Sequence, residues 1–154
     1  MASLLDQTNI SLYTLPASWI LCLLPRFYAA YLYTSTTSKS LDFVLPRALA
    51  ARATADQALD STTRDRIVRA EAAQANGLEN VGYFSAAVVA GNMAGLGKGI
   101  LNTLSLGYLV SRGVYNWIYV VGGTKKLALL RTGVFFGGQG LLFALFILAG
   151  NRMR

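Results

Sequence analysis

The chain has 154 residues, of which 54% are hydrophobic and 14% are charged, against about 25% charged residues in an average globular protein. A chain of this length cannot bury so much apolar surface in one water-soluble core, because small domains leave much of their surface exposed. Its one cysteine, Cys22, and its lack of histidine exclude a disulfide scaffold, a zinc site and catalysis by imidazole. We therefore expect a single membrane domain, residues 1 to 154, with no bound metal.

The net charge is +7, and no acidic residue follows Glu79. The second half of the chain therefore has cations without carboxylates of its own, which is typical of a protein that meets an anionic ligand or membrane phosphates. So basic a chain would also attract nucleic acid. However, the cations lie beside hydrophobic segments and not on a polar face rich in aromatic residues, so we expect the lipid bilayer as partner and no nucleic acid.

Four segments approach the length of about 20 apolar residues that a membrane-spanning helix needs. They lie at residues 10 to 33, 68 to 94, 99 to 122 and 126 to 149, and each contains polar or charged residues. A charge in the middle of a bilayer costs about 2.5 to 3.5 kcal/mol, so these side chains should face a bundle interior or an interface. The sequence thus predicts an all-α integral membrane fold, a bundle of four transmembrane helices. In the last segment Gly133 and Gly137 form a GxxxG pair, which lets helices approach closely.

A polar connector, residues 34 to 67, separates the first two segments, and its Ala-rich part, residues 45 to 59, is long enough for a short surface helix. Cations near the segment ends are unevenly distributed. The segment ends on one side of the membrane have Lys39, Arg47, Arg52, Arg64, Arg66, Lys125 and Lys126. The segment ends on the other side have Lys98, Arg152 and Arg154. Because cytosolic loops are richer in Lys and Arg, this distribution predicts a cytosolic connector and two lumenal termini.

The second segment contains the most informative run, RAEAAQANGLENVGYF, residues 69 to 84. At 3.6 residues per turn, several polar side chains share an arc of about 100°, whereas Gln74 points elsewhere. The residues on this arc are Arg69, Asn76, Glu79, Asn80 and Tyr83. Such a face forms either a polar clamp between helices or part of a binding site.

The third segment repeats the pattern, with one face made of Tyr108, Arg112, Tyr115, Asn116 and Tyr119. A guanidinium among phenols in a dry setting needs an anion, and the nearest candidate in the chain is Glu79. If Arg112 pairs with Glu79, then Arg69 and Arg131 remain for a bound anion.

Together these residues resemble a known family. The run RAxxAQxNGLEN, followed by RxxYxxxY and by an arginine that opens the last segment, is similar to the membrane-associated proteins in eicosanoid and glutathione metabolism, the MAPEG family. The form AxxNGLEN is most like microsomal glutathione transferases of the bacterial and fungal type. This resemblance implies a homotrimer of four-helix subunits in the endoplasmic reticulum or another internal membrane. It also implies that glutathione, as co-substrate, binds between subunits in a site open to the cytosol.

The resemblance also implies roles for individual residues. Asn76 and Glu79 would hold the γ-glutamyl end of glutathione, and Gln74 would contact its other end from a different helix face. Arg69 and Arg112 would complete the glutathione-binding set. Ala72 stands where leukotriene C synthase and related transferases have an arginine, so capture of the tripeptide would need Arg69, Arg26 or a connector arginine as a substitute.

The catalytic residues would be Arg131, Tyr115 and Tyr119. A thiol with a pKa of about 8.5 is mostly protonated at neutral pH, and a neighbouring guanidinium favours the thiolate. Arg131 would therefore activate the thiol of glutathione, and a tyrosine would donate a hydrogen bond to a developing oxyanion. The implied function is a membrane-bound glutathione transferase, with peroxidase activity as an extension, that acts on hydrophobic small-molecule substrates.

Two other functions remain open. The first is a repurposed enzyme that isomerises or cyclises a hydrophobic metabolite, with Arg112, Tyr115 and Glu79 as its acid and base set. The second is a non-catalytic lipid-binding scaffold. Retention of Arg131, Glu79 and both tyrosines favours catalysis, whereas the absence of a cation at Ala72 favours the alternatives.

Overall fold

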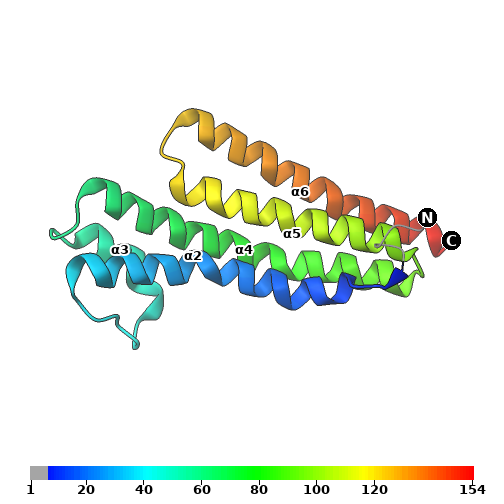
Figure 1. Cartoon of the computed structure of the whole chain (residues 1–154), viewed down its shortest axis with the longest axis horizontal. Coiled ribbons are helices and arrows are strands. Elements are labelled where there is room, and N and C mark those ends of the chain that lie inside the picture. The colour runs from blue at the N-terminus through cyan, green and yellow to red at the C-terminus, as the bar shows by residue number, and fades with distance from the viewer. Residues whose placement is uncertain (1–6) are drawn as a thin grey trace.

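The computed structural model describes residues 7–154, and within them it contains five α-helices and no strand (Figure 1). Four helices are long: α2 (Thr14–Thr37), α4 (Ser61–Met93), α5 (Lys98–Val121) and α6 (Lys125–Arg152). A short helix η1 (Ser11–Tyr13) precedes α2, and η2 (Pro46–Ala48) leads into the short helix α3 (Leu49–Ala55) in the connector. The prediction of an all-helical fold is confirmed.

The long helices overlap the four predicted segments but differ from them at their ends. Helix α4 begins at Ser61 and not near residue 68, because the Asp60 carboxylate caps it and accepts a hydrogen bond from the Thr63 amide at 2.9 Å. Helix α2 continues to Thr37 and ends at Ser38, whose φ of 57° is left-handed. A search for apolar segments does not find this extra helical length, because residues 61 to 67 are mostly polar.

Two helical segments are long and apolar enough to cross a membrane: Ser11–Thr37 and Lys125–Arg152. The lengths of α4 and α5 are also sufficient. These two helices carry the polar faces described above and are not among the two apolar segments. The apolar helices therefore flank the polar ones in the sequence.

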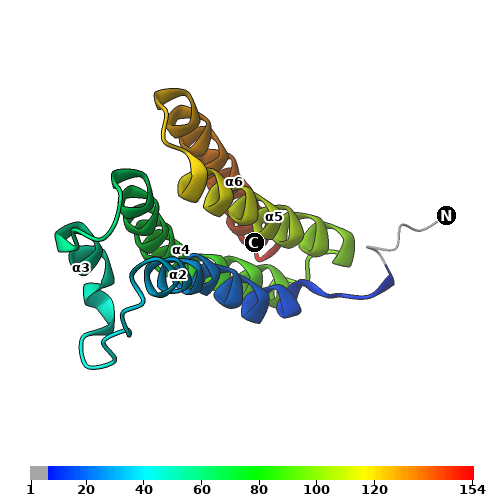
Figure 2. The same cartoon turned by 60° about the vertical axis from the view of Figure 1, so that its left-hand side comes forward.

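The long helices pair as α2 with α4 and α5 with α6, and the two pairs separate toward the end that holds α3 (Figure 2). Helix α2 begins, and α6 ends, at the opposite end of the bundle (Figure 1). The connector and the turn between α5 and α6 thus lie at one end, together with the larger set of cations. The charge asymmetry of the sequence is therefore an asymmetry between the two ends of the molecule.

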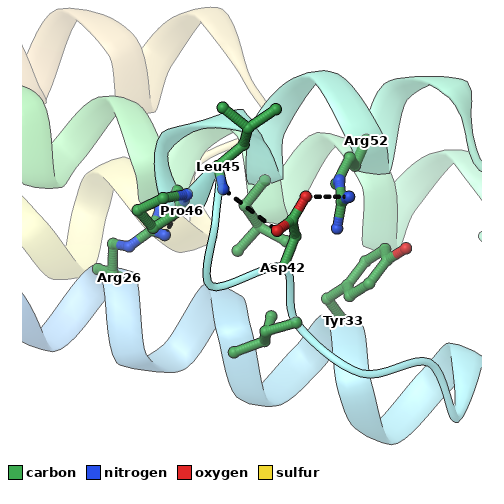
Figure 3. Close-up of a pocket in the computed structure, with 8 residues that line it drawn as sticks. Arg26, Tyr33, Asp42, Leu45, Pro46 and Arg52 are labelled. Atoms are coloured by element: carbon green, nitrogen blue, oxygen red, sulfur yellow. Dashed lines mark hydrogen bonds and ion pairs between the residues drawn. The ribbon is translucent and has the colours of Figure 1, made fainter.

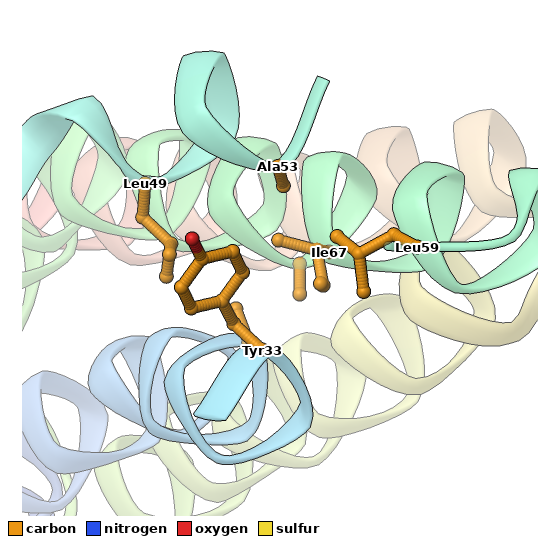
Figure 4. Close-up of a cluster of buried hydrophobic side chains, with 7 residues drawn as sticks. Tyr33, Leu49, Ala53, Leu59 and Ile67 are labelled. Atoms are coloured by element: carbon orange, nitrogen blue, oxygen red, sulfur yellow. The ribbon is translucent and has the colours of Figure 1, made fainter. Parts of the chain in front are cut away.

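Two clusters of buried apolar side chains hold the helices together. One lies at the connector end, where Tyr33 of α2, Leu49 of α3 and Ile67 of α4 pack together (Figure 4). The other lies further along the bundle, where Phe84 of α4 stacks on Tyr108 of α5 with ring centroids 4.3 Å apart. The first cluster fixes the connector on α2 and α4, and the second fixes α4 on α5.

Asp42 organises the turn that leads into α3 (Figure 3). Its carboxylate accepts hydrogen bonds from the amides of Val44, at 2.8 Å, and Leu45, at 3.1 Å, and it pairs with Arg52 of α3. The amides of Leu45 and Val44, with Arg52 beyond them, lower the pKa of the Asp42 carboxyl group below its ordinary value. Asp42 is therefore ionised at neutral pH and keeps the turn closed.

The GxxxG pair does not pack against another helix within the chain. A Cβ added at Gly133 or Gly137 would meet no atom within 4 Å, whereas one at Gly138 would lie 2.8 Å from the Ser111 hydroxyl of α5. The pair thus makes no close contact with another helix among the described residues, and its role in helix packing stays a prediction. The contact is absent because α6 turns its Gly138 face, and not its Gly133 face, toward α5.

Gly77 marks the closest approach of α4 to α2, because a Cβ there would lie 2.8 Å from the Cys22 sulfur and 3.4 Å from its Cα. We expect Gly77→Ala to destabilise the protein by about 1 to 3 kcal/mol, since the backbone of α2 must move. The matched control is Gly82→Ala, where no atom lies within 4 Å of the added Cβ. Thermal unfolding of both variants in detergent tests this, and equal midpoints would contradict the proposed contact.

Candidate functional site

Five of the predicted site residues form one continuous cluster at the junction of α4, α5 and α6. We call it the Arg112 cluster, and its members are Asn76, Arg112, Tyr115, Tyr119 and Arg131. On α5 the three members are spaced by three and four residues, which places their side chains on one helix face. Asn76 joins this face from α4, and Arg131 joins it from the second turn of α6.

Arg112 lies at the centre of the cluster and is only 4% exposed. Its Nη2 donates a hydrogen bond to the Asn76 carboxamide oxygen at 2.6 Å. Its guanidinium also lies over the Tyr115 ring, 4.2 Å from the centroid, where the negative face of the aromatic ring attracts a cation. Arg112 thus connects α5 to α4 through a neutral partner.

Arg131 lies at the other side of the cluster. Its guanidinium is 4.0 Å from the centroid of the Tyr119 ring, and Tyr119 meets Tyr115 edge to face at 5.5 Å. Phe135, one turn after Arg131, lies beside Tyr115 at 6.0 Å. The two arginines therefore flank a pair of phenols, which gives the site two cations and two hydroxyl groups.

The expected pair between Arg112 and Glu79 does not form. Residues 7–154 contain three ion pairs, and none includes Arg112 or Glu79. Glu79 is exposed and lies about 60° around α4 from Asn76, so Asn76 and not Glu79 is the residue that meets the Arg112 guanidinium. Arg112 is therefore a buried cation with no carboxylate partner in the described part of the chain.

Arg69 and Gln74 lie outside the Arg112 cluster. The Nε of Arg69 donates to the Val120 carbonyl at 3.2 Å, a carbonyl in the last turn of α5 that has no partner within its own helix. Arg69 thus clamps the end of α5 onto α4. Gln74 lies on the opposite side of α4 from Asn76, since two residues correspond to about 200° of rotation.

Gln74 lines a separate cavity of about 560 Å³ between α4 and the connector. Arg26 and Arg47 also line it, and Arg26 pairs with Glu71 and donates to the Pro46 carbonyl. The second oxygen of Glu71 is buried without a hydrogen-bond partner among the described residues. This cavity, which we call the Gln74 cavity, therefore has two cations and one carboxylate at its wall, and the carboxylate is paired with Arg26.

Sequence reasoning did not identify several polar contacts near the site. The Gln139 amide of α6 donates to the Asn80 side chain at 2.7 Å, so it links α6 to α4 one turn beyond Asn76. The position of Gln139 in an apolar segment indicated such a contact, because polar groups in membrane helices face the bundle interior. The Arg26 pair with Glu71 gave no such signal, since the two residues lie 45 positions apart.

The chemistry available to the Arg112 cluster is that of cations and phenols. The two guanidinium groups can stabilise an anion, and the phenols can donate hydrogen bonds to developing negative charge. Within residues 7–154 no group of three His, Cys, Asp or Glu side chains is arranged to hold a metal ion. A thiolate or a carboxylate is the kind of ligand that fits this cluster.

A family model described as the MAPEG family matches residues 13–151, nearly the whole chain. The chain belongs to the MAPEG family. No curated protein and no solved structure matches it. Membership of the MAPEG family, together with the two apolar helices, supports a membrane-associated protein with a glutathione-related function of the transferase or isomerase type.

We expect Asn76→Ala to destabilise the protein by about 1 to 3 kcal/mol, because the buried Arg112 guanidinium loses its hydrogen-bond acceptor. Asn76→Asp is the matched variant, since a carboxylate accepts the same hydrogen bond and neutralises the cation. It should retain the wild-type unfolding midpoint. Thermal unfolding in detergent without added ligand measures both, and an unchanged midpoint for Asn76→Ala would show that Arg112 has another acceptor.

Proposed function

We propose that the protein is a membrane-bound glutathione transferase that activates the glutathione thiolate for attack on lipophilic electrophiles. The observation that carries this proposal is the buried Arg112 cation without a carboxylate partner in residues 7–154. A buried charge of this kind is costly unless an anion compensates it. A thiolate beside Arg112 and Arg131 would supply the missing negative charge.

The reaction follows from the order of groups in the Arg112 cluster. Arg131 would lie beside the thiol and lower its pKa by favouring the charged form. The thiolate would then attack an electrophilic carbon of the second substrate, forming a carbon–sulfur bond as the leaving group departs with its electron pair. Tyr115 or Tyr119 would donate a hydrogen bond to charge that develops on an oxygen of the substrate. Reduction of a lipid hydroperoxide by the same thiolate would extend this activity.

The position of Gln74 supports a site built between subunits of a homotrimer. Gln74 and Asn76 lie on opposite sides of α4, so one small tripeptide does not reach both in a single subunit. A neighbouring copy that placed its Gln74 cavity against the Arg112 cluster would bring them together. In that arrangement Arg26 and Arg47 of the cavity would bind a carboxylate of glutathione and replace the cation that is absent at Ala72.

Glu79 has two uses in this proposal. Because it is exposed and has no ion pair within residues 7–154, it is free to pair with the ammonium group of glutathione. The same property favours the second candidate, an isomerase or cyclase in which Glu79 takes a proton from a hydrophobic metabolite. Turnover of such a substrate without glutathione would distinguish the second candidate from the first.

The proposed orientation places the connector end in the cytosol and both termini in the lumen of the endoplasmic reticulum or another internal membrane. The cations gathered at the connector end support it. Glutathione would then enter from the cytosol at the end where the two helix pairs separate, and the lipophilic substrate would arrive through the bilayer.

The transferase proposal predicts saturable binding of glutathione to the purified protein in detergent, with thiolate absorbance, and turnover of an aryl halide. Arg131→Ala should reduce the thiolate signal at neutral pH at least about tenfold, because loss of the cation raises the thiol pKa by a unit or more. Arg131→Lys is the control that keeps the charge. Glu79→Gln should instead weaken binding about tenfold through loss of a charged hydrogen bond.

Two results would contradict these assignments. Wild-type protein that neither binds glutathione saturably nor turns over the aryl halide would exclude the transferase proposal. If Arg131→Ala abolished binding while Glu79→Gln abolished only thiolate formation, the function would stand and the two roles would be exchanged.

The homotrimer predicts complementation between two inactive variants. Arg131→Ala damages the Arg112 cluster, and the double variant Arg47→Ala/Gln74→Ala damages the Gln74 cavity. Mixed trimers, purified by two different affinity tags, each contain one interface in which both faces are wild type. They should therefore recover about one third of wild-type turnover. Activity no greater than that of the single-variant trimers would place the whole site within one subunit.

A further inference from the structure

A series of side-chain amides continues from the Arg112 cluster toward the middle of α6. Arg112 donates to the carboxamide oxygen of Asn76 at 2.6 Å. One turn further along α4, the carboxamide nitrogen of Asn80 donates to the backbone carbonyl of Asn76 at 2.8 Å. The carboxamide nitrogen of Gln139 on α6 then donates to the carboxamide oxygen of Asn80 at 2.7 Å. Gln139 is therefore the last member of a series that begins at the proposed site.

A backbone carbonyl fixes the orientation of the last two amides in this series. The carbonyl of Asn76 only accepts hydrogen bonds, so the end of the Asn80 carboxamide that faces it is the NH2 group. The oxygen of Asn80 therefore faces Gln139, and Gln139 presents its own NH2 group there. The opposite orientation of Gln139 would place two oxygens against each other. As a result, the Oε1 atom of Gln139 is the end of the series that is left for another partner.

This Oε1 atom is both unpaired and accessible. The hydrogen bond to Asn80 uses the nitrogen of Gln139, and no described residue donates to Oε1. Gln139 is partly exposed, and Oε1 is not among the polar atoms that are fully buried without a partner. An unpaired atom outside that group keeps accessible surface, so a ligand can reach it. In a bilayer no water is present to satisfy such an acceptor, which makes a donor on the ligand favourable.

The surroundings of Oε1 define the kind of donor that fits it. Gln139 lies in the middle of α6, where an ionised donor would be costly in a bilayer. Phe136 and Phe143, three residues before it and four residues after it, share its side of the helix. Both phenylalanine side chains are exposed. An acceptor between two exposed aromatic rings suits a neutral hydroxyl group carried on a hydrocarbon chain.

The distance between Gln139 and Arg131 determines where that hydroxyl group lies on the ligand. Gln139 follows Arg131 by eight residues, which is about 12 Å along the helix axis. In the proposed transferase, Arg131 lies beside the thiolate and hence beside the reacting carbon of the second substrate. We propose that Gln139 is a specificity-determining residue, and that the second substrate is a lipid electrophile with a hydroxyl group about 12 Å from its reacting carbon. This inference rests on the proposed transferase function.

Two matched epoxides test the inference, with the full-length protein in lipid nanodiscs and with glutathione present. One is the terminal epoxide of ω-undecenyl alcohol, whose extended chain separates the hydroxyl group from the epoxide by a similar distance. The other is its methyl ether, which has no donor. In both, the thiolate forms a bond to the terminal carbon as the ring carbon–oxygen bond breaks, and the ring oxygen keeps the electron pair and takes a proton from water. We expect kcat/KM to be about tenfold higher for the alcohol than for the ether.

Two variants separate the acceptor from the contact between α4 and α6. Gln139→Leu and Asn80→Leu both remove the hydrogen bond between these side chains, but only Gln139→Leu removes Oε1. Gln139→Leu should turn over the two epoxides equally. Asn80→Leu should keep a smaller preference for the alcohol, because the released carboxamide can also turn its NH2 group toward the ether oxygen. The ratio of the two substrates within one variant does not depend on how much of the protein is folded.

The outcomes distinguish this inference from the function on which it rests. Wild-type protein that turns over an aryl halide but does not distinguish the two epoxides would overturn the inference and leave the transferase proposal intact. No turnover of any electrophile would exclude the transferase proposal, and the inference with it. An undiminished preference for the alcohol in Gln139→Leu would assign the hydroxyl group to another acceptor. Complete loss of the preference in both variants would assign it to the contact between α4 and α6, and not to Oε1.

Discussion

The burial of the Arg112 guanidinium is the constraint around which the polar part of this bundle is arranged. A cation removed from water needs hydrogen bonds and negative potential, and the chain supplies them with a carboxamide from α4 and an aromatic ring from α5 itself. Both partners are neutral, so the charge stays uncompensated within residues 7–154. The hydrogen bond from Arg112 to Asn76, which connects α4 to α5, therefore also leaves the guanidinium charge available to bind an anion.

The fold separates this polar site from the contacts that hold the helices together. The apolar clusters lie on both sides of it, one under the connector and one around Phe84 and Tyr108. Close packing of α2 against α4 depends on Gly77 and Cys22. The cysteine, the one thiol of the chain, is thus a small buried packing residue in the contact between α2 and α4.

Helical periodicity was sufficient to predict much of the fold and the site. It identified one polar face of α4, which contains Asn76, and one face of α5, which contains Arg112 and the two tyrosines, while the family resemblance assigned the two faces to one site. Periodicity did not predict that Arg112 would bond to Asn76 and not to Glu79. Spacing within a helix determines which side chains share a face, but the rotation of one helix against another depends on packing across the whole interface. The same limit explains Gly133, which shares its helix with Gly138 but faces away from α5.

The early start of α4 has a consequence for where the site lies relative to the membrane. At 1.5 Å per residue, its 33 residues extend about 50 Å, whereas the hydrocarbon layer of a bilayer is about 30 Å thick. Part of α4 must therefore project beyond the lipid or tilt strongly, and the connector packs along its first turns. If that end projects, Gln74 and Asn76 lie near the depth at which headgroups replace acyl chains. A water-soluble peptide could then reach the site from the aqueous side, and a substrate dissolved in the membrane could reach it from the lipid.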